Sequence, residues 1–337
     1  MRRLAASAAL LVAAPFALAA CTAETAESET ADATAAAPRE QEAVELLQVT
    51  SPHEATGGTL LEGPTFGEDG LLYVVDVMAP AGEPKVLRVD VADKSAEAVF
   101  SDETSAFTSA QFSPADGRLY LTDIASGSIT SMTADGADVQ SVFAGEVDGS
   151  AMLPDDIAFD PDGNMFVSDT NGMRGPGWET PGRVVRVGLD GAASVLAADL
   201  PSPNGIVFDE DDAGLYIAQY NANRIDYYGL DETGSAVVTA HPAVHVDGMR
   251  ARVDSTAVDA DGNLYQAFHG RPAIAVFSPT GEQLQTISVA GDGLDSATNI
   301  AIAPGTSDGY VTVSGPAGGY IYSFDALAEG TRQSNGG

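Results

Sequence analysis

The chain has 337 residues, which suffices for one large domain or two ordinary ones. Its 49 Asp and Glu outweigh 15 Lys and Arg, and the net charge of −34 argues against nucleic acid and anionic lipid as partners, because both attract a basic surface. An apolar fraction of 44% excludes a disordered acidic chain without a core. One Cys and four His exclude a disulfide framework and disfavour a thiolate or His-rich metal centre, so we expect oxygen ligands for any metal.

The first residues have the pattern of an export signal. Arg2 and Arg3 form a basic start, and the apolar run that follows is too short for a membrane span. The run ends in small residues directly before Cys21, as in a bacterial lipobox. We predict a lipoprotein signal peptide over residues 1–20 and a lipid anchor on Cys21, which would hold the exported protein on the cell envelope, periplasmic or outer, through the lipid alone. An ordinary secretory signal that ends beside a Cys is the alternative.

A low-complexity segment follows the predicted anchor. Residues 22–43 are rich in Ala, Thr and Glu, with no aromatic residue and no apolar period. Such a composition cannot fill a core, so we predict a disordered tether over residues 21–45. The folded part is expected over residues 46–330, and residues 331–337 are expected to form a disordered tail.

One pattern recurs six times in the folded part: a polar residue, alternating apolar residues, an acidic turn, an aromatic residue and a second apolar run. Turns such as Asp162-Gly163 and Asp261-Gly262 predict hairpins. The aromatic anchors lie 45 to 50 residues apart, at Tyr73, Tyr120, Phe166, Tyr216, Tyr265 and Tyr310. This spacing is typical of a propeller blade, whereas a β-sandwich needs no regular period. We therefore predict an all-β, six-bladed β-propeller of four-stranded blades, with residues 43–50 as a candidate outer strand that closes the ring.

The innermost strands of a propeller line its central channel, so residues at the same position of each unit meet around one axis. Counted eleven places back from each anchor, and one further where a unit has an inserted residue, these are Glu62, Ser109, Asp155, Asn204, Asp254 and Thr298, or Asn299 if the sixth unit has no insertion. Each residue alone fits a turn or a cap. Three carboxylates and an amide in one register, however, would repel one another without a cation, and hard oxygen ligands suit Ca²⁺, with Mg²⁺, Mn²⁺ or Zn²⁺ as substitutes.

These residues stand in motifs that resemble the senescence marker protein, gluconolactonase and luciferin-regenerating enzyme family. The motifs are Glu62-Gly63-Pro64, Asp155-Asp156, Pro203-Asn204-Gly205, and Asp254 before the AVDADGNLY segment. The resemblance covers about residues 60–330. It is greatest for the bacterial drug-responsive lactonases, which share Asp254-Ser255, the AIAPGT turn and a closing segment like residues 324–330.

The resemblance implies a Ca²⁺-dependent lactone hydrolase. It assigns the ion to Glu62, Asp155, Asn204 and Asp254, with Ser255 as a further contact and Asp254 as the general acid/base. The ion would polarise the lactone carbonyl, orient water and offset the charge that develops on the oxygen, while Asp254 moves the proton. A carboxylate bound to Ca²⁺ is a weak base, so an acidic neighbour is needed to raise its proton affinity. Asp156 is the candidate, with a hydrogen-bonding role beside the site as the alternative.

Five further residues are expected to contact a small lactone or ester substrate. Ser109 and Asn299 share the register of the predicted ligands. Arg174 and Trp178 stand in a Gly- and Pro-rich loop, residues 171–182, which we interpret as a lid over the channel or else as a surface loop with a packed Trp. His269 ends a predicted strand of the fifth unit, where a structural His at the rim is the alternative to a proton shuttle.

Three functions remain open from the sequence. A Ca²⁺-dependent lactonase is favoured, and the alternatives are a phosphotriesterase on the same metal site and a non-catalytic propeller that binds a ligand or protein. No Gly-x-Ser-x-Gly motif supports a serine hydrolase. We expect a monomer with no nucleic-acid partner.

Overall fold

The structure, a computed structural model, describes residues 37–170, 174–176 and 178–335. The predicted signal peptide, the predicted lipidation site Cys21 and the tether as far as residue 36 lie outside these residues. Within the described part, no helix is long and apolar enough to cross a membrane. The regular elements of this part are strands, with short 3₁₀ turns such as η2 (Tyr220–Ala222), so the protein is all-β as the alternating pattern predicted.

Four sheets contain four strands each, hydrogen-bonded in chain order, and a short hairpin precedes the third. The first two sheets are β2 (Leu61–Phe66), β3 (Leu72–Asp76), β4 (Pro84–Asp90) and β5 (Ser95–Ser101), and then β6 (Phe107–Phe112), β7 (Leu119–Asp123), β8 (Ser128–Met132) and β9 (Gln140–Ala144). The hairpin is β10 (Glu146–Val147) and β11 (Ser150–Ala151). The third and fourth sheets are β12 (Pro154–Phe159), β13 (Met165–Asp169), β14 (Gly182–Val187) and β15 (Ala193–Leu200), and then β16 (Pro203–Phe208), β17 (Gly214–Gln219), β18 (Arg224–Leu230) and β19 (Val237–His245).

The other strands form one nine-stranded sheet instead of the separate four-stranded sheets that we predicted. Its members are β1 (Arg39–Thr50), β20 (Arg252–Asp259), β21 (Leu264–His269), β22 (Ala273–Phe277), β23 (Gln283–Val289), β24 (Ser296–Ile302), β25 (Asp308–Gly315), β26 (Gly318–Asp325) and β27 (Gly330–Asn335). Strands β20 to β23 pair in order, as do β24 to β26 with β1. Two contacts merge these groups, because β1 also pairs with β23 and Phe268 of β21 pairs with Ala297 of β24. Repeat spacing cannot reveal such pairing between neighbouring units.

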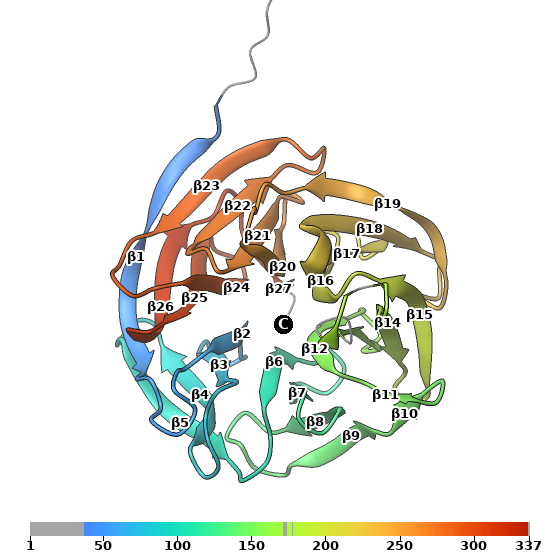
Figure 1. The fold of residues 1–337 in the computed structure, drawn as a ribbon, viewed down its shortest axis with the longest axis horizontal. Coiled ribbons are helices and arrows are strands. Elements are labelled where there is room, and N and C mark those ends of the chain that lie inside the picture. The colour runs from blue at the N-terminus through green and yellow to red at the C-terminus, as the bar shows by residue number, and fades with distance from the viewer. Residues whose placement is uncertain (1–36, 171–173, 177, 336–337) are drawn as a thin grey trace, which may run out of the picture. The chain divides into compact units, whose positions relative to one another are not determined.

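Figure 1 shows the sheets arranged around a common centre, with β2, β6, β12, β16, β20 and β24 innermost. Aromatic rings join neighbouring sheets, because an anchor ring meets a ring that ends an inner strand of the next unit. The pairs and their centroid distances are Tyr73–Phe112 at 5.0 Å, Tyr120–Phe159 at 5.1 Å, Phe166–Phe208 at 5.1 Å and Tyr310–Phe66 at 5.6 Å. All four are edge-to-face, an arrangement that favours aromatic pairs beyond the area they bury. The last pair joins the final unit to the first.

Both ends of the folded part extend further than we predicted. Strand β1 begins at Arg39, so residues 39–45 belong to a sheet and not to the tether. Residues 43–50 were predicted as an outer strand, and residues 44–50 pair with β26 of the last unit. The earlier residues of β1 pair through their backbone with β23 and have no apolar pattern in the sequence. Strand β27 extends to Asn335 and pairs with β20 near the centre of the ring (Figure 1), where we expected a disordered tail.

Gly63 lies where β2 crosses close to β6. Its φ is +55°, and a Cβ atom there would be 2.4 Å from the backbone nitrogen of Ala110. We expect Gly63→Ala to lower the free energy of unfolding by about 2–4 kcal/mol, because it adds backbone strain to a steric clash. The control Gly70→Ala, at φ +78° with open space around it, should cost about 1 kcal/mol. Chemical denaturation measures both, and equal losses would contradict the close approach.

Candidate active site

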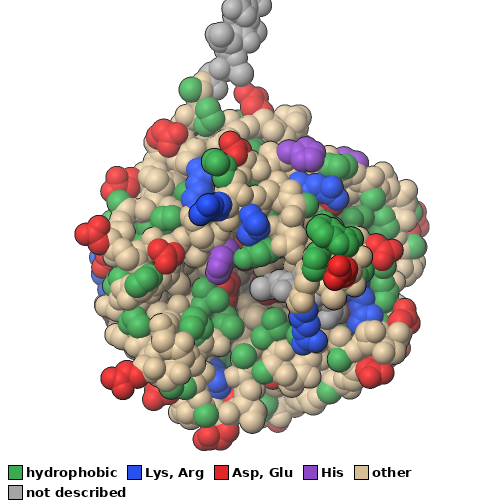
Figure 2. Space-filling model, viewed as in Figure 1, with side chains coloured by type: hydrophobic (Ala, Val, Ile, Leu, Met, Phe, Trp, Pro, Cys, Tyr) green, Lys and Arg blue, Asp and Glu red, His purple; other side chains and the backbone are tan. Residues whose placement is uncertain are grey.

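The four predicted metal ligands line one cavity of about 200 Å³. They come from four different inner strands: Glu62 from β2, Asp155 from β12, Asn204 from β16 and Asp254 from β20. The residues near this end of the inner strands thus meet as the repeat register predicted. Figure 2 shows the molecule hollowed at the centre of the ring on the face in view. We call the opening of this cavity the mouth.

In the first three units, a second repeated residue holds the segment that leads into the inner strand. It is an Asp three places after the anchor aromatic, at the end of the second strand of its unit, and it is buried. Its Oδ1 accepts the backbone N–H of a residue just before the inner strand or at its start: Asp76 from Leu60 at 3.1 Å, Asp123 from Ala106 at 3.0 Å, and Asp169 from Leu153 at 2.8 Å. These charge-assisted bonds position the start of the inner strand, where the predicted ligands stand.

Glycines follow two of the predicted ligands because neighbouring backbones approach there. A Cβ atom on Gly205, the residue after Asn204, would be 2.7 Å from the carbonyl oxygen of Asp254. Gly63 after Glu62 is confined in the same way by β6. The Glu-Gly and Asn-Gly pairs are therefore packing requirements beside the cavity.

Burial and mutual repulsion raise the proton affinity of the acids here. Burial raises the pKa of Asp155 to about 7. Burial, and then the charges of neighbouring carboxylates, raise the pKa values of Glu62, Asp156 and Asp254 well above the usual range. Four acids that disfavour each other's ionisation are an arrangement that a cation stabilises.

The hydrogen bonds leave two oxygens without protein partners. Asn204 Nδ2 donates to Asp155 Oδ2 at 2.8 Å, while Asn204 Oδ1 and Asp254 Oδ2 are buried and have no hydrogen-bond partner. As the side chains lie, no three His, Cys, Asp or Glu in the described part form a metal-binding group. The fit to a cation therefore rests on the donor set, which is hard oxygen with two unsatisfied atoms, and not on a finished cage.

Asp156, Ser255 and Asn299 form a buried chain beside the cavity. Ser255 Oγ donates to Asp156 Oδ2 and accepts a hydrogen bond from Asn299 Nδ2 at 2.6 Å. The backbone N–H of Asp156 donates to Ser168 Oγ at 2.9 Å. None of the three predicted residues lines the cavity, so the expected contact of Ser255 with the metal and of Asn299 with substrate remain predictions.

The other predicted substrate residues lie in different surroundings. His269 lines the cavity with Nδ1 3.8 Å from Asp254 Oδ2, and burial lowers its pKa, so the imidazole is neutral at neutral pH. Ser109 is fully buried, its hydroxyl has no hydrogen-bond partner, and it does not line the cavity. Arg174 and Trp178 are exposed, Trp178 by 85%, and neither lines the cavity. The predicted lid stays a prediction.

Several lining residues escaped the sequence interpretation. Val77, Ile124 and Tyr220 line the cavity together with His269, and all four stand four places after an anchor aromatic. Burial, and then the charge of Asp254, raise the pKa of Tyr220 to about 12, so its hydroxyl remains a donor at neutral pH. The same count from the aromatic anchors would have predicted these residues if it had been extended to the positions after the anchors, at the end of the second strands.

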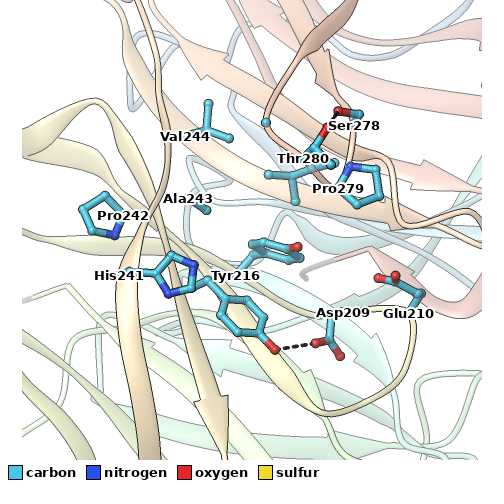
Figure 3. Close-up of a pocket in the computed structure, with 13 residues that line it drawn as sticks. Asp209, Glu210, Tyr216, His241, Pro242, Ala243, Val244, Ser278, Pro279 and Thr280 are labelled. Carbon is cyan, nitrogen blue, oxygen red and sulfur yellow. Dashed lines mark hydrogen bonds between the residues drawn. The ribbon is translucent and has the colours of Figure 1, made fainter. Parts of the chain in front are cut away.

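A separate groove of about 410 Å³ lies between β17 to β19 and the turn from β22 to β23 (Figure 3). Tyr216 and Tyr227 pack together with centroids 5.3 Å apart, and the hydroxyl of Tyr227 donates to Asp209 Oδ2 at 2.8 Å. None of the predicted site residues lines this groove, so the candidate chemistry belongs to the central cavity.

Residues 60–315 match the sequence model of the SMP-30/Gluconolactonase/LRE-like region. A lactonase drp35 from Staphylococcus saprophyticus is 27% identical over 286 residues, which cover 81% of this chain and 85% of that protein. Two solved structures are similar in fold. Regucalcin from Agrobacterium tumefaciens, a calcium-binding protein, has a TM-score of 0.70 at 16% identity and covers 87% of this chain and 98% of its own. A gluconolactonase from Xanthomonas campestris has a TM-score of 0.66 at 21% identity and covers 84% and 97%. The family match spans most of the described residues, and the chain belongs to the SMP-30/gluconolactonase/LRE-like family.

Proposed function

We propose that the protein is a metal-dependent lactone hydrolase with its reaction centre in the central cavity. The observation that carries this proposal is the convergence of Glu62, Asp155, Asn204 and Asp254 from four inner strands around one cavity. The names of the relatives agree with it, because they include a lactonase and a gluconolactonase. The ion is Ca²⁺ in this proposal, in keeping with the oxygen donors and the calcium-binding relative.

The four lining residues Glu62, Asp155, Asn204 and Asp254 would hold the ion. When bound, the ion supplies a Lewis acid that stabilises the negative charge on a lactone carbonyl oxygen. The same charge offsets the mutual repulsion of the buried carboxylates, which agrees with their raised pKa values.

The proton transfers are assigned to Asp254. Its Oδ2 has no hydrogen-bond partner, so it is free to accept a proton from the water that attacks the carbonyl carbon. When the ring C–O bond breaks, the same carboxyl returns the proton to the alkoxide, and the product is a hydroxy acid. Asp156 does not line the cavity, and its charge adds to burial and to the charge of Asp254 in raising the pKa of Glu62.

Neighbouring side chains orient the reactants in this proposal. The protonated hydroxyl of Tyr220 offers a donor to the substrate, and the neutral His269 lies next to Asp254 Oδ2. Leu60, Val77 and Ile124 line the same cavity and exclude water from part of it.

We also propose the finer architecture and the location. Counting β20 to β23 as one blade and β24 to β26 with β1 as another, the chain forms six four-stranded blades. Such a ring is consistent with the inner strands around the common centre (Figure 1). Export and a lipid anchor on Cys21 remain our proposal from the sequence.

Hydrolysis by the purified full-length protein tests the function. With millimolar Ca²⁺ we expect turnover of at least one member of a panel of aliphatic, aromatic and sugar lactones. Excess chelator should lower the rate by about a hundredfold or more, and added Ca²⁺ should restore it, because the ion stabilises the developing charge. A pH-stat records the released acid.

The same assay separates the alternatives. Turnover of a phosphotriester but of no lactone would favour the phosphotriesterase, and no turnover of either would favour a binding propeller. Lactone turnover that chelator leaves unchanged would contradict the metal dependence.

A further inference from the structure

Three arginines of the fifth unit lie close, along the chain or across a strand pair, to His269, which lines the cavity. Arg250 lies in the connection from β19 to β20, Arg252 is the first residue of β20, and Arg271 lies in the connection from β21 to β22. We call these residues the arginine cluster. Arg252 pairs with His269 across β20 and β21, which places it beside a residue that lines the cavity.

The arginine cluster has no acidic partner among the residues that the structure describes. Arg88, Arg118, Arg183, Arg224 and Arg332 each form an ion pair with Asp or Glu, but Arg250, Arg252 and Arg271 form none. Other basic residues of the described part, such as Arg174 and Arg186, form no ion pair either, so the cluster is distinguished by its closeness to His269, which lines the cavity. The charges of the cluster are thus available to an external anion.

Two of the three guanidinium groups are held by contacts other than carboxylates. Arg252 Nη1 donates to the backbone carbonyls of Met249, Arg250 and Ala251 at 3.3, 3.3 and 3.1 Å. The Arg271 guanidinium lies over the ring of Phe268, 5.0 Å from its centroid. Orientation by backbone and ring reduces the entropy that would be lost when an anion binds.

Positive charges gather nearer the centre of the ring than negative charges on the face in view. Figure 2 shows Lys and Arg side chains around the central hollow, with most Asp and Glu nearer the outer edge. Asp247 lies in the same connection as Arg250, and Asp295 lies in the connection from β23 to β24, but neither is within ion-pair distance of the cluster. Burial, and then the charge of Asp254, raise the pKa of Tyr220, and the positive charge of Arg252 offsets part of this rise, which is consistent with its closeness to the cavity.

We propose that the arginine cluster is an anion subsite, and that the substrate is a lactone carrying a carboxylate or phosphate group outside the ring. This inference rests on the proposed lactone hydrolysis. The carboxylates of the cavity, Glu62, Asp155 and Asp254, repel such a group from the centre. The cluster attracts it at the mouth, so the neutral lactone ring faces the cavity while the anionic end stays outside.

Matched substrates test the subsite in the full-length protein with Ca²⁺. One lactone carries a terminal carboxylate, a second carries a phosphate, and a third carries the methyl ester of the first. We expect Arg252→Gln to lower kcat/KM for the preferred anionic lactone by about 10- to 100-fold, chiefly through KM, and to change the methyl ester by less than about twofold. Added salt should weaken the anionic reaction alone. Whichever anionic lactone loses more kcat/KM in Arg252→Gln shows whether the subsite prefers a carboxylate or a phosphate.

Arg118→Gln is the control. Arg118 is ion-paired with Asp138 and lies after the turn between β6 and β7, at the end of its unit opposite to the start of the inner strand. It should leave the ratio of anionic to neutral kcat/KM unchanged. If Arg252→Gln lowers all three reactions equally, or if the anionic lactones show no preference and no salt dependence, the subsite is overturned while the hydrolase stands.

A binding measurement distinguishes a wrong anion-subsite proposal from a wrong lactone-hydrolase proposal. If no lactone is hydrolysed, calorimetry compares an open-chain hydroxy acid with its neutral amide. Salt-sensitive binding of the acid that Arg252→Gln weakens at least tenfold supports the anion subsite without the reaction. Equal binding of acid and amide overturns it.

Discussion

Replacing Asp254 with Asn is expected to lower kcat/KM for lactone hydrolysis by about a thousandfold. Asn has nearly the same size and keeps an oxygen that can bind a cation, but it cannot accept the proton of the attacking water. The loss should fall mainly on kcat, because the proton moves in the transition state and not on binding. Steady-state kinetics at saturating Ca²⁺ measure it, with calorimetry to show that Ca²⁺ still binds.

Asp261→Asn is the matched control for this variant. Asp261 stands at the exposed turn of the same hairpin, between β20 and β21, away from the cavity. It should retain activity within about twofold. If Asp254→Asn keeps more than about a tenth of the activity while Ca²⁺ remains bound, the proton role belongs to another group.

Removing the divalent cation is expected to make stability depend on pH in the neutral range. The pKa of Asp155 is raised to about 7, and those of Glu62 and Asp254 are raised well above the usual range, by burial first. The folded protein therefore binds protons that the unfolded chain has released, and stability falls as the pH rises through the folded pKa values. Without metal, the melting temperature should be several degrees higher at pH 6.5 than at pH 8.

Added Ca²⁺ should offset the loss of stability that the metal-free protein shows as the pH rises. At a hundred times its dissociation constant, a ligand specific to the folded state adds about 2.7 kcal/mol, or roughly 5 °C for a protein of this size. The effect should be larger at pH 8, where the carboxylates are ionised. Calorimetry with Ca²⁺ or chelator at the two pH values measures it, and Glu62→Gln with Asp155→Asn is the control that should raise the metal-free melting temperature and abolish the Ca²⁺ effect. A melting temperature insensitive to Ca²⁺ at both pH values would contradict a cation in the cavity.

The convergence of the candidate ligands was predictable because the chain repeats. Glu62, Asp155, Asn204 and Asp254 lie far apart in sequence, yet they occupy equivalent positions in repeated units. Repetition around a ring brings equivalent positions to the same axis. One count from the aromatic anchors therefore located a set that no single tripeptide could specify. The anchors themselves also pack as repeated contacts, such as Tyr73 on Phe112.

Features that depend on contacts between units were not predictable. The bond from Asn204 to Asp155 and the chain through Asp156, Ser255 and Asn299 join side chains from different inner strands. Their direction depends on rotamers and packing, which no spacing encodes. The same holds for Arg252, whose missing acidic partner is visible only when every neighbour is in place.

The sequence by itself determined the all-β class, the repeat and the four residues around the cavity, because alternation and period are local properties of the chain. The tertiary structure alone decided where the folded part begins and ends. Residues 43–50 were predicted as an outer strand, but residues 39–42 and Gly330–Asn335 have no apolar pattern and are held by backbone pairing of β1 with β23 and of β27 with β20. It also decided which of the 49 acids meet at the centre and which basic residues remain unpaired beside them, since charge becomes specific only through distance.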